Sequence, residues 1–225
     1  METSHTVNLS DTKKAILLLI DYAVEPDEQE DAIKLLDKYE SDYIALNIFH
    51  EFYSYLPEAQ NDTIRVIRQL DYQDGTFLTA ISTNIDTYLY IANHEGALFL
   101  GTAKDGIWDE EVLDFFKTTH EKALEKYQNI GEFPLYVPAH INKELCKVCS
   151  VKDGELHRFG CPVEICPWCQ GQLANCNCRF SQTKQKQFKT EIQLDKFLKT
   201  LEKKGRIPFS VTDQSIGFAG AGPQD

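Results

Sequence analysis

Seven cysteines and one histidine with the spacing of metal ligands lie in one short stretch of the chain. They are Cys146, Cys149, His157, Cys161, Cys166, Cys169, Cys176 and Cys178, and the chain has no other cysteine. Zinc binds thiolate sulfur and imidazole nitrogen in closed tetrahedral sites, so eight such ligands are enough for two ions. A closed site leaves no position for water or substrate. The spacing therefore predicts one or two Zn²⁺ ions in a structural role.

Two other uses of the thiols compete with metal binding. Disulfides are disfavoured because the number of cysteines, seven, is odd. They are also disfavoured because the polar first ten residues do not resemble a secretory signal, which predicts a cytoplasmic, reducing location. A redox dithiol at Cys166–Cys169 is disfavoured because prolines and glycines surround it, whereas such motifs usually open a helix after a buried strand. Metal binding is the preferred interpretation, and a single ion with spare thiols stays open.

The spacing alone does not sort the eight ligands between two metals. In a cross-braced arrangement, the pairs Cys146–Cys149 and Cys166–Cys169 share one metal, and the other four ligands hold the second. In a sequential arrangement, the first four ligands of the chain hold one metal and the last four hold the other. We expect the cross-braced arrangement, because the two Cys-x-x-Cys turns have the same spacing.

The segment from Gly154 to Cys178 resembles a zinc-binding segment of many uncharacterised bacterial proteins. It contains Gly160-Cys161, then Cys166-Pro-Trp-Cys169-Gln-Gly-Gln-Leu173, and ends with Cys176-Asn-Cys178. Those proteins carry a preceding Cys-x-x-Cys and a Cys-Pro-x-Cys-Gly-Gly-Gln-Leu core. This chain has Gln170 where glycine is usual, and the turn after such a pair often needs a positive φ, so we expect mild strain there. The resemblance extends over about half of the chain and implies zinc and a bacterial, cytoplasmic origin, but no reaction.

The charge of the chain is divided unevenly. The net charge of −12 combines −16 for residues 1–140, which have 26 acidic and 10 basic side chains, with +4 for residues 141–225, which have 9 and 13. A small positive excess without a dense basic stripe disfavours nucleic acid as a partner. No apolar run approaches the roughly 18 residues that span a membrane, so we expect a soluble protein without membrane insertion.

The apolar pattern predicts an α+β fold that begins with helices. Three helical segments are expected between residues 10 and 53. Their expected first residues are Ser10 or Asp11, Asp27 or Glu28, and the residue after Asp42. A fourth helix is expected to open at Pro57 and to carry Ile64, Ile67 and Leu70 on its apolar face.

The pattern then changes to alternating apolar residues, which predict a small antiparallel sheet. Three short strands are expected between residues 76 and 103, with turns at Asn84 and Asn93–Gly96. Asp109 is expected to cap a single helix that reaches Leu124, and Trp108 is expected to be a core anchor. Residues 131–140 then form a linker into the cysteine-rich stretch.

The rest of the chain completes a division into four parts. Residues 179–190 predict a loop or short strand, and the apolar residues around Phe197 predict a last helix that ends at Gly205. The expected parts are an acidic α+β body (1–135), a zinc-ribbon-like module (141–180), a basic loop with the C-terminal helix (181–210) and a flexible tail (211–225).

The sequence has no arrangement typical of a catalytic site. It lacks a nucleophile elbow, a phosphate loop and a dinucleotide fingerprint, and no His-x-Glu precedes a Pro-Cys-x-x-Cys as in zinc deaminases. Trp168 lies between two expected ligands, where a rigid, exposed aromatic would suit contact with a protein partner. We expect a non-enzymatic zinc-binding interaction, scaffold or adaptor protein, a candidate subunit of a larger bacterial assembly, with a protein partner and no identified small-molecule substrate. The alternatives are an enzyme with a site between body and zinc module, and a nucleic-acid-binding zinc ribbon.

Overall fold

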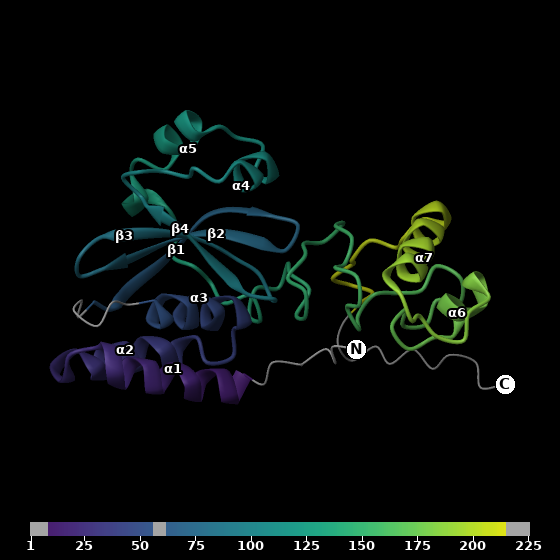
Figure 1. Ribbon diagram of the computed structural model, residues 1–225, viewed down its shortest axis with the longest axis horizontal. Helices are drawn as coiled ribbons and strands as arrows, with labels where there is room; N and C mark the ends of the chain where they lie inside the picture. The colour runs from purple at the N-terminus through teal and green to yellow at the C-terminus, as the bar shows by residue number, and fades with distance from the viewer. Residues whose placement is uncertain (1–8, 56–61, 215–225) are drawn as a thin grey trace. The chain divides into compact units, whose positions relative to one another are not determined.

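The computed structural model describes residues 9–55 and 62–214 of the chain. It divides into two compact units, Met1–Asn142 and Lys143–Asp225, whose elements are drawn in Figure 1. The first unit combines helices with a four-stranded antiparallel sheet, and the second contains the cysteine-rich stretch followed by a long helix. The predicted α+β class is therefore confirmed.

Three helices open the first unit, close to the predicted positions. They are α1 (Leu9–Ala23), α2 (Pro26–Lys38) and α3 (Tyr43–Ser54). Pro26 starts α2, where its missing N–H would have no helical partner anyway. Asp42 caps α3 by accepting a hydrogen bond from the backbone N–H of Ala45 at 2.8 Å. α1 packs against both other helices and buries Ile16 and Ile20 completely.

The sheet is an antiparallel meander in the order β1-β2-β3-β4. Its strands are β1 (Ile64–Gln73), β2 (Thr76–Thr83), β3 (Thr87–Ala92) and β4 (Ala97–Thr102). Asp74 and Gly75 join β1 to β2 with positive φ angles of 47° and 73°, the conformation that a tight hairpin requires. The three strands expected between residues 76 and 103 are confirmed.

β1 replaces the helix that the sequence predicts through Ile64, Ile67 and Leu70, so that prediction is wrong. Register shifts between Ile64 and Val66, and between Gln69 and Asp71, interrupt the alternation of the strand. Each irregularity adds a residue, so the buried apolar side chains recur at every third position and imitate a helical pattern. Pro57, the expected first residue of that helix, lies outside the described residues.

Two layers cover the sheet (Figure 1). α3 packs against β3 and β4, and the second layer is formed by α4 (Glu110–Phe115), α5 (His120–Lys126) and the 3₁₀ turn η1 (Ile130–Glu132). The core below this second layer consists of Leu70, Leu78, Ala80, Leu89, Ile107, Val112, Leu113, Ala123 and Tyr127.

The predicted cap at Asp109 is confirmed, because its carboxylate accepts hydrogen bonds from the N–H groups of Glu111 and Val112. The single helix expected to follow it is wrong. Lys117 has a positive φ of 53°, which ends α4, and Thr119 caps α5 as a separate helix. This break bends the chain so that both short helices lie on the sheet.

The segment expected to be a linker adds to the sheet instead. The carbonyl of Pro134 accepts a hydrogen bond from the N–H of Gln69 at 3.1 Å, and the backbone N–H of Tyr136 donates to the carbonyl of Ile67 at 2.9 Å. This segment therefore covers the outer edge of β1. Asp42 fixes its end, since its buried carboxylate accepts hydrogen bonds from the Tyr136 hydroxyl at 3.0 Å and from the N–H of Ala139 at 2.5 Å.

Within residues 143–214, the second unit forms two helices, α6 (Cys178–Thr183) and α7 (Glu191–Lys204). The prediction of a loop or short strand for residues 179–190 is wrong for the first part of this segment, which belongs to α6. α7 confirms the last predicted helix, which ends at Gly205 with a φ of 89°. Of the tail predicted to be flexible, residues 211–214 form a turn with Gln214 buried, and the remaining residues 215–225 lie outside the described part.

We predict that Asp42→Asn lowers the free energy of unfolding of the first unit by about 2 kcal/mol, because an amide cannot accept all of the buried hydrogen bonds that Asp42 receives. Urea unfolding followed by circular dichroism measures this change. Asp37→Asn on α2 is the matched control: its carboxylate is 54% exposed, and Lys13, its ion-pair partner, also contacts Glu40. We expect less than about 0.5 kcal/mol for the control. Equal losses would show that Asp42 has no special role.

Candidate metal centres

The first Cys-x-x-Cys pair lies at the tip of a short hairpin. The hairpin is closed by a bridge between Leu145 and Lys152. Within it, the N–H of Cys146 donates to the carbonyl of Val151 at 2.8 Å, and the N–H of Ser150 donates to the carbonyl of Cys146 at 2.9 Å. Ser150 turns the chain with a φ of 59°. These bonds fix the loop so that both sulfurs point to one side.

The second pair repeats this geometry. A bridge between Ile165 and Gln172 closes the hairpin, the N–H of Cys166 donates to Gly171 at 2.7 Å, and the N–H of Gln170 donates to Cys166 at 2.9 Å. Gln170 has a φ of 60°, so the positive φ expected at this non-glycine residue is confirmed. The two hairpins are therefore structural repeats of each other.

The first cluster consists of Cys146, Cys149, His157 and Cys161, whose ligand atoms all lie within 4.8 Å of one another. All four residues are buried. The sulfurs of Cys146 and Cys161 are 3.9 Å apart, and the sulfur of Cys149 is 3.3 Å from Nδ1 of His157. A tetrahedral zinc ion with usual bond lengths separates two sulfurs by about 3.8 Å. The donor set and its spacing therefore fit a zinc ion.

The second cluster consists of Cys166, Cys169, Cys176 and Cys178, and its sulfurs also lie within 4.8 Å of one another. Cys166 is buried, Cys176 and Cys178 are half-buried, and Cys169 is exposed. Cys178 is the first residue of α6, so this short helix carries one of the four sulfurs. Four thiolates suit zinc and other soft metal ions.

The expected cross-braced arrangement is wrong, because the clusters follow the order of the chain. The similarity of the two hairpins does not make them share a metal. Each hairpin is followed by a turn that brings its own remaining ligands back to it. In the first case, the N–H of Cys161 donates to Arg158 at 3.0 Å, and in the second the N–H of Cys176 donates to Gln172 at 2.9 Å.

The thiols and the imidazole of the first cluster shift one another's pKa values. Hydrogen bonds from Cys149 and Cys161 hold the pKa of Cys146 far below its usual range, and contact with Cys146 and Cys149 raises the pKa of Cys161. Burial lowers the pKa of His157, but the sulfurs of Cys146 and Cys149, together with Gln214, outweigh burial and raise this pKa to about 10. Closely packed thiols cannot all ionise unless a cation compensates them.

Gln214 orients the histidine of the first cluster. Its Oε1 lies 2.7 Å from Nε2 of His157, and its own amide nitrogen donates to the carbonyl of Pro208 at 2.8 Å. Because a carbonyl oxygen only accepts, Nε2 must carry a hydrogen, and Nδ1, which faces the sulfur of Cys149, is the atom that would bind a metal in place of its own proton. No local pattern indicates this partner, since Gln214 lies far along the chain, in the tail expected to be flexible.

An ion pair between the buried Glu164 and the half-buried Arg206 connects the two clusters. Glu164 lies between Cys161 and Cys166, and its Oε1 accepts from Nε of Arg206 at 2.7 Å. Arg206 also donates to the carbonyl oxygen of His157. The backbone carbonyl of Glu164 accepts from the N–H of Leu173 at 2.8 Å. Arg206 therefore ties the loop of the first cluster to the start of the second hairpin.

The structure reverses both expectations for tryptophan. Trp168, expected to be an exposed contact residue, is half-buried and lies 6.3 Å from the ring of Phe197 on α7. Trp108, expected to be a core anchor, is 69% exposed and stacks on the ring of His120 at 3.8 Å. Trp168 thus serves the packing of the second cluster, and Trp108 lies on the surface of the first unit.

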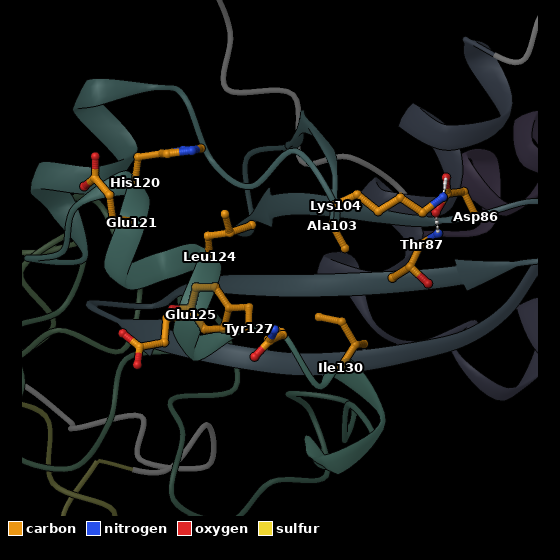
Figure 2. Close-up of a pocket in the computed structure, with 11 residues that line it drawn as sticks. Asp86, Thr87, Ala103, Lys104, His120, Glu121, Leu124, Glu125, Tyr127 and Ile130 are labelled. Carbon is orange, nitrogen blue, oxygen red and sulfur yellow. Dashed lines mark hydrogen bonds and ion pairs between the residues drawn. The ribbon is translucent and has the colours of Figure 1, made fainter.

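The first unit has a hollow of about 920 Å³ beside α5. Figure 2 shows Leu124, Tyr127 and Ile130 on one side of it, with Asp86 and Lys104 opposite. Asp86 and Lys104 form an ion pair with each other at 2.7 Å. The lining also includes the titratable side chains of His120, Glu121 and Glu125, so the hollow combines an apolar floor with a charged rim.

Comparison of the chain with protein-family models, with curated proteins and with solved structures finds no match. The interpretation of the clusters therefore rests on their geometry. All seven cysteines are free thiols rather than disulfides. Within residues 9–55 and 62–214, no helix is long and apolar enough to cross a membrane.

We predict that Gln214→Ala lowers the affinity of the first cluster for zinc by about 10- to 100-fold, because His157 loses the contact that fixes its tautomer and orientation. Competition with a chelator of known affinity, on the full chain, measures this change. Thr212→Ala is the matched control, since Thr212 lies in the same turn and its hydroxyl forms a hydrogen bond with the Ser210 hydroxyl. Unchanged zinc affinity in the Gln214 variant would contradict the role of this contact.

Proposed function

We propose that the chain is a bacterial, cytoplasmic interaction protein without enzymatic activity, in which two structural Zn²⁺ ions hold the second unit in shape. One observation carries this proposal. Each cluster brings four ligands from the chain itself within 4.8 Å, so a tetrahedral metal has no open position for substrate or water. The histidine in the first cluster favours zinc over an iron–sulfur centre.

The need for metal follows from the small cores of the second unit. Around the first cluster, the buried apolar residues other than cysteines are Val151 and Phe209. Around the second, they are Leu173, Phe197 and Leu201. Such cores are too small to order the intervening loops by burial alone. Zinc binding supplies on the order of 10 kcal/mol per site, which makes up this deficit.

We predict two zinc ions per chain in protein purified without added metal, as measured by elemental analysis. Cys166→Ser should reduce this number to one and expose the second hairpin to limited proteolysis, because one ligand of four is lost. The helices α1 to α3 should keep their circular dichroism signal, since they belong to the other unit. Less than half a zinc ion per chain would contradict the proposal.

One face of α7 is suited to contact with a protein partner. Phe197 and Leu201 anchor the opposite face of this helix in the core. On the outer face, Ile192 is 80% exposed, and three exposed lysines continue the same stripe. The lysines are Lys196, Lys199 and Lys203. Spacings of four, three and four residues align these side chains along the helix. An apolar anchor followed by positive charges complements an acidic protein segment that carries an apolar side chain.

We predict that Lys196→Glu combined with Lys199→Glu reduces capture of this partner by about tenfold, because the variant repels an acidic segment. The measurement is quantitative mass spectrometry of proteins retained from a nuclease-treated bacterial extract. Lys34→Glu combined with Lys122→Glu is the control, with the same change in net charge on exposed positions of the first unit. Retention that disappears with nuclease, together with binding to DNA that the α7 variant abolishes, would instead favour the nucleic-acid-binding alternative.

A further inference from the structure

The two clusters differ in their access to solvent. In the first, Cys146 and Cys149 are 1% exposed and Cys161 is 5% exposed. In the second, Cys166 is buried, but Cys169 is exposed and its two remaining partners are half-buried. The clusters therefore have the same number of ligands and similar hairpins, but only one of them presents a thiol to the solvent.

The surroundings of the first cluster explain its protection. The ring of Phe209 packs against His157 with the ring centres 5.2 Å apart. Gln214 covers the other ring nitrogen of the same histidine, and the chain around Phe209 is held by a hydrogen bond from its N–H to Glu155 at 2.7 Å. The C-terminal segment thus forms a cover over the first cluster.

We propose that the second cluster is a peroxide-sensitive site, in which oxidation at Cys169 releases the metal while the first cluster keeps its own. This inference rests on the proposed function, because it requires both clusters to hold zinc. The reactive species is a thiolate, and its rate of oxidation depends on access. Cys169 is the ligand that a dissolved oxidant reaches first.

The chemistry requires only hydrogen peroxide as co-reactant. The sulfur of Cys169 attacks one peroxide oxygen, the O–O bond breaks, and a sulfenic acid and hydroxide form. The sulfur of Cys176 or Cys178 then attacks the sulfenic sulfur and displaces a second hydroxide, which leaves a disulfide. Two thiolates lose two electrons in total, and the peroxide gains them. The two remaining sulfurs hold zinc too weakly to retain it.

Loss of this metal would also change the surface that α7 presents. Cys166 belongs to the same buried cluster as Phe197 and Leu201 of α7, and Trp168 and Cys178 pack against that cluster. Without a metal, the hairpin and α6 lose the ligand bonds that hold them against α7. Oxidation would therefore loosen the support beneath the lysine stripe on the outer face of this helix.

The test is a peroxide titration of the zinc-loaded full chain. Released zinc is followed with a chromogenic zinc chelator, and the oxidised cysteines are identified by differential alkylation and mass spectrometry. We expect one zinc ion per chain to be released about tenfold faster than the other, with a disulfide that contains Cys169. Cys146, Cys149 and Cys161 should still be reduced when the first ion has left.

Cys169→His removes the exposed thiol of the second cluster but keeps its number of ligands at four. Histidine can replace a thiolate as a zinc ligand, so this variant should still hold two zinc ions but should release neither one quickly. Cys169→Ser, which removes the ligand, should begin with one zinc ion that peroxide releases slowly. A matching change at the buried residue, Cys161→His, should leave the fast release unchanged.

Three results would overturn the inference. They are simultaneous release of both ions, oxidation of Cys146 or Cys161 before Cys169, and fast release that persists in Cys169→His. All three occur in protein that holds two zinc ions and leave the proposed structural role intact. Purified protein with no zinc at all would contradict the proposed function and, with it, this inference.

Discussion

The second unit is governed by one electrostatic constraint: four soft ligands within 4.8 Å of one another can all ionise only if a cation compensates them. Without it, neighbouring thiols share protons, and the pKa values of Cys146 and Cys161 move in opposite directions. With a divalent ion, all of the thiolates are compensated at once. The loops between the ligands then need little apolar burial of their own, which is why so few apolar residues lie around either cluster.

The first unit is built on the opposite principle. Its sheet has a layer on each face, and its core contains buried residues of β1, β2 and β3, including Leu70, Leu78 and Leu89, against which the half-buried Leu100 of β4 packs. A buried carboxylate, Asp42, joins the start of α3 to the segment that covers β1. These contacts do not involve a thiol. The first unit is therefore stable through burial, whereas under the proposed function the second unit is stable through ligand bonds, so that metal loss would affect the second unit directly.

Local signals in the sequence predicted most of the helices and strands, but they did not predict the contacts between residues that are distant in the chain. Asp109 and Gly205 mark helix ends by the chemistry of capping, which needs no knowledge of the fold. The residues of both clusters were found by type and spacing. The assignment of the ligands to two separate clusters was not predicted, because it depends on the turns at Cys161 and Cys176 rather than on the similar hairpins. Gln214 had no local signal, since its role is set by the path of the chain around His157.

The sequential partition of the ligands would permit two bound metals to behave differently. In a cross-braced unit, each metal closes loops that contain ligands of the other, so losing one ion frees the chain around both. Here each metal would close its own short loop, and the ion pair of Glu164 with Arg206 connects the loops. Glu164 is buried and Arg206 is half-buried, and the pair does not include a ligand atom. Under the proposed function, the first cluster would therefore keep its four bonds, its cover and its anchored histidine while the second opens, so a permanent site and a releasable site would coexist in a unit of this size.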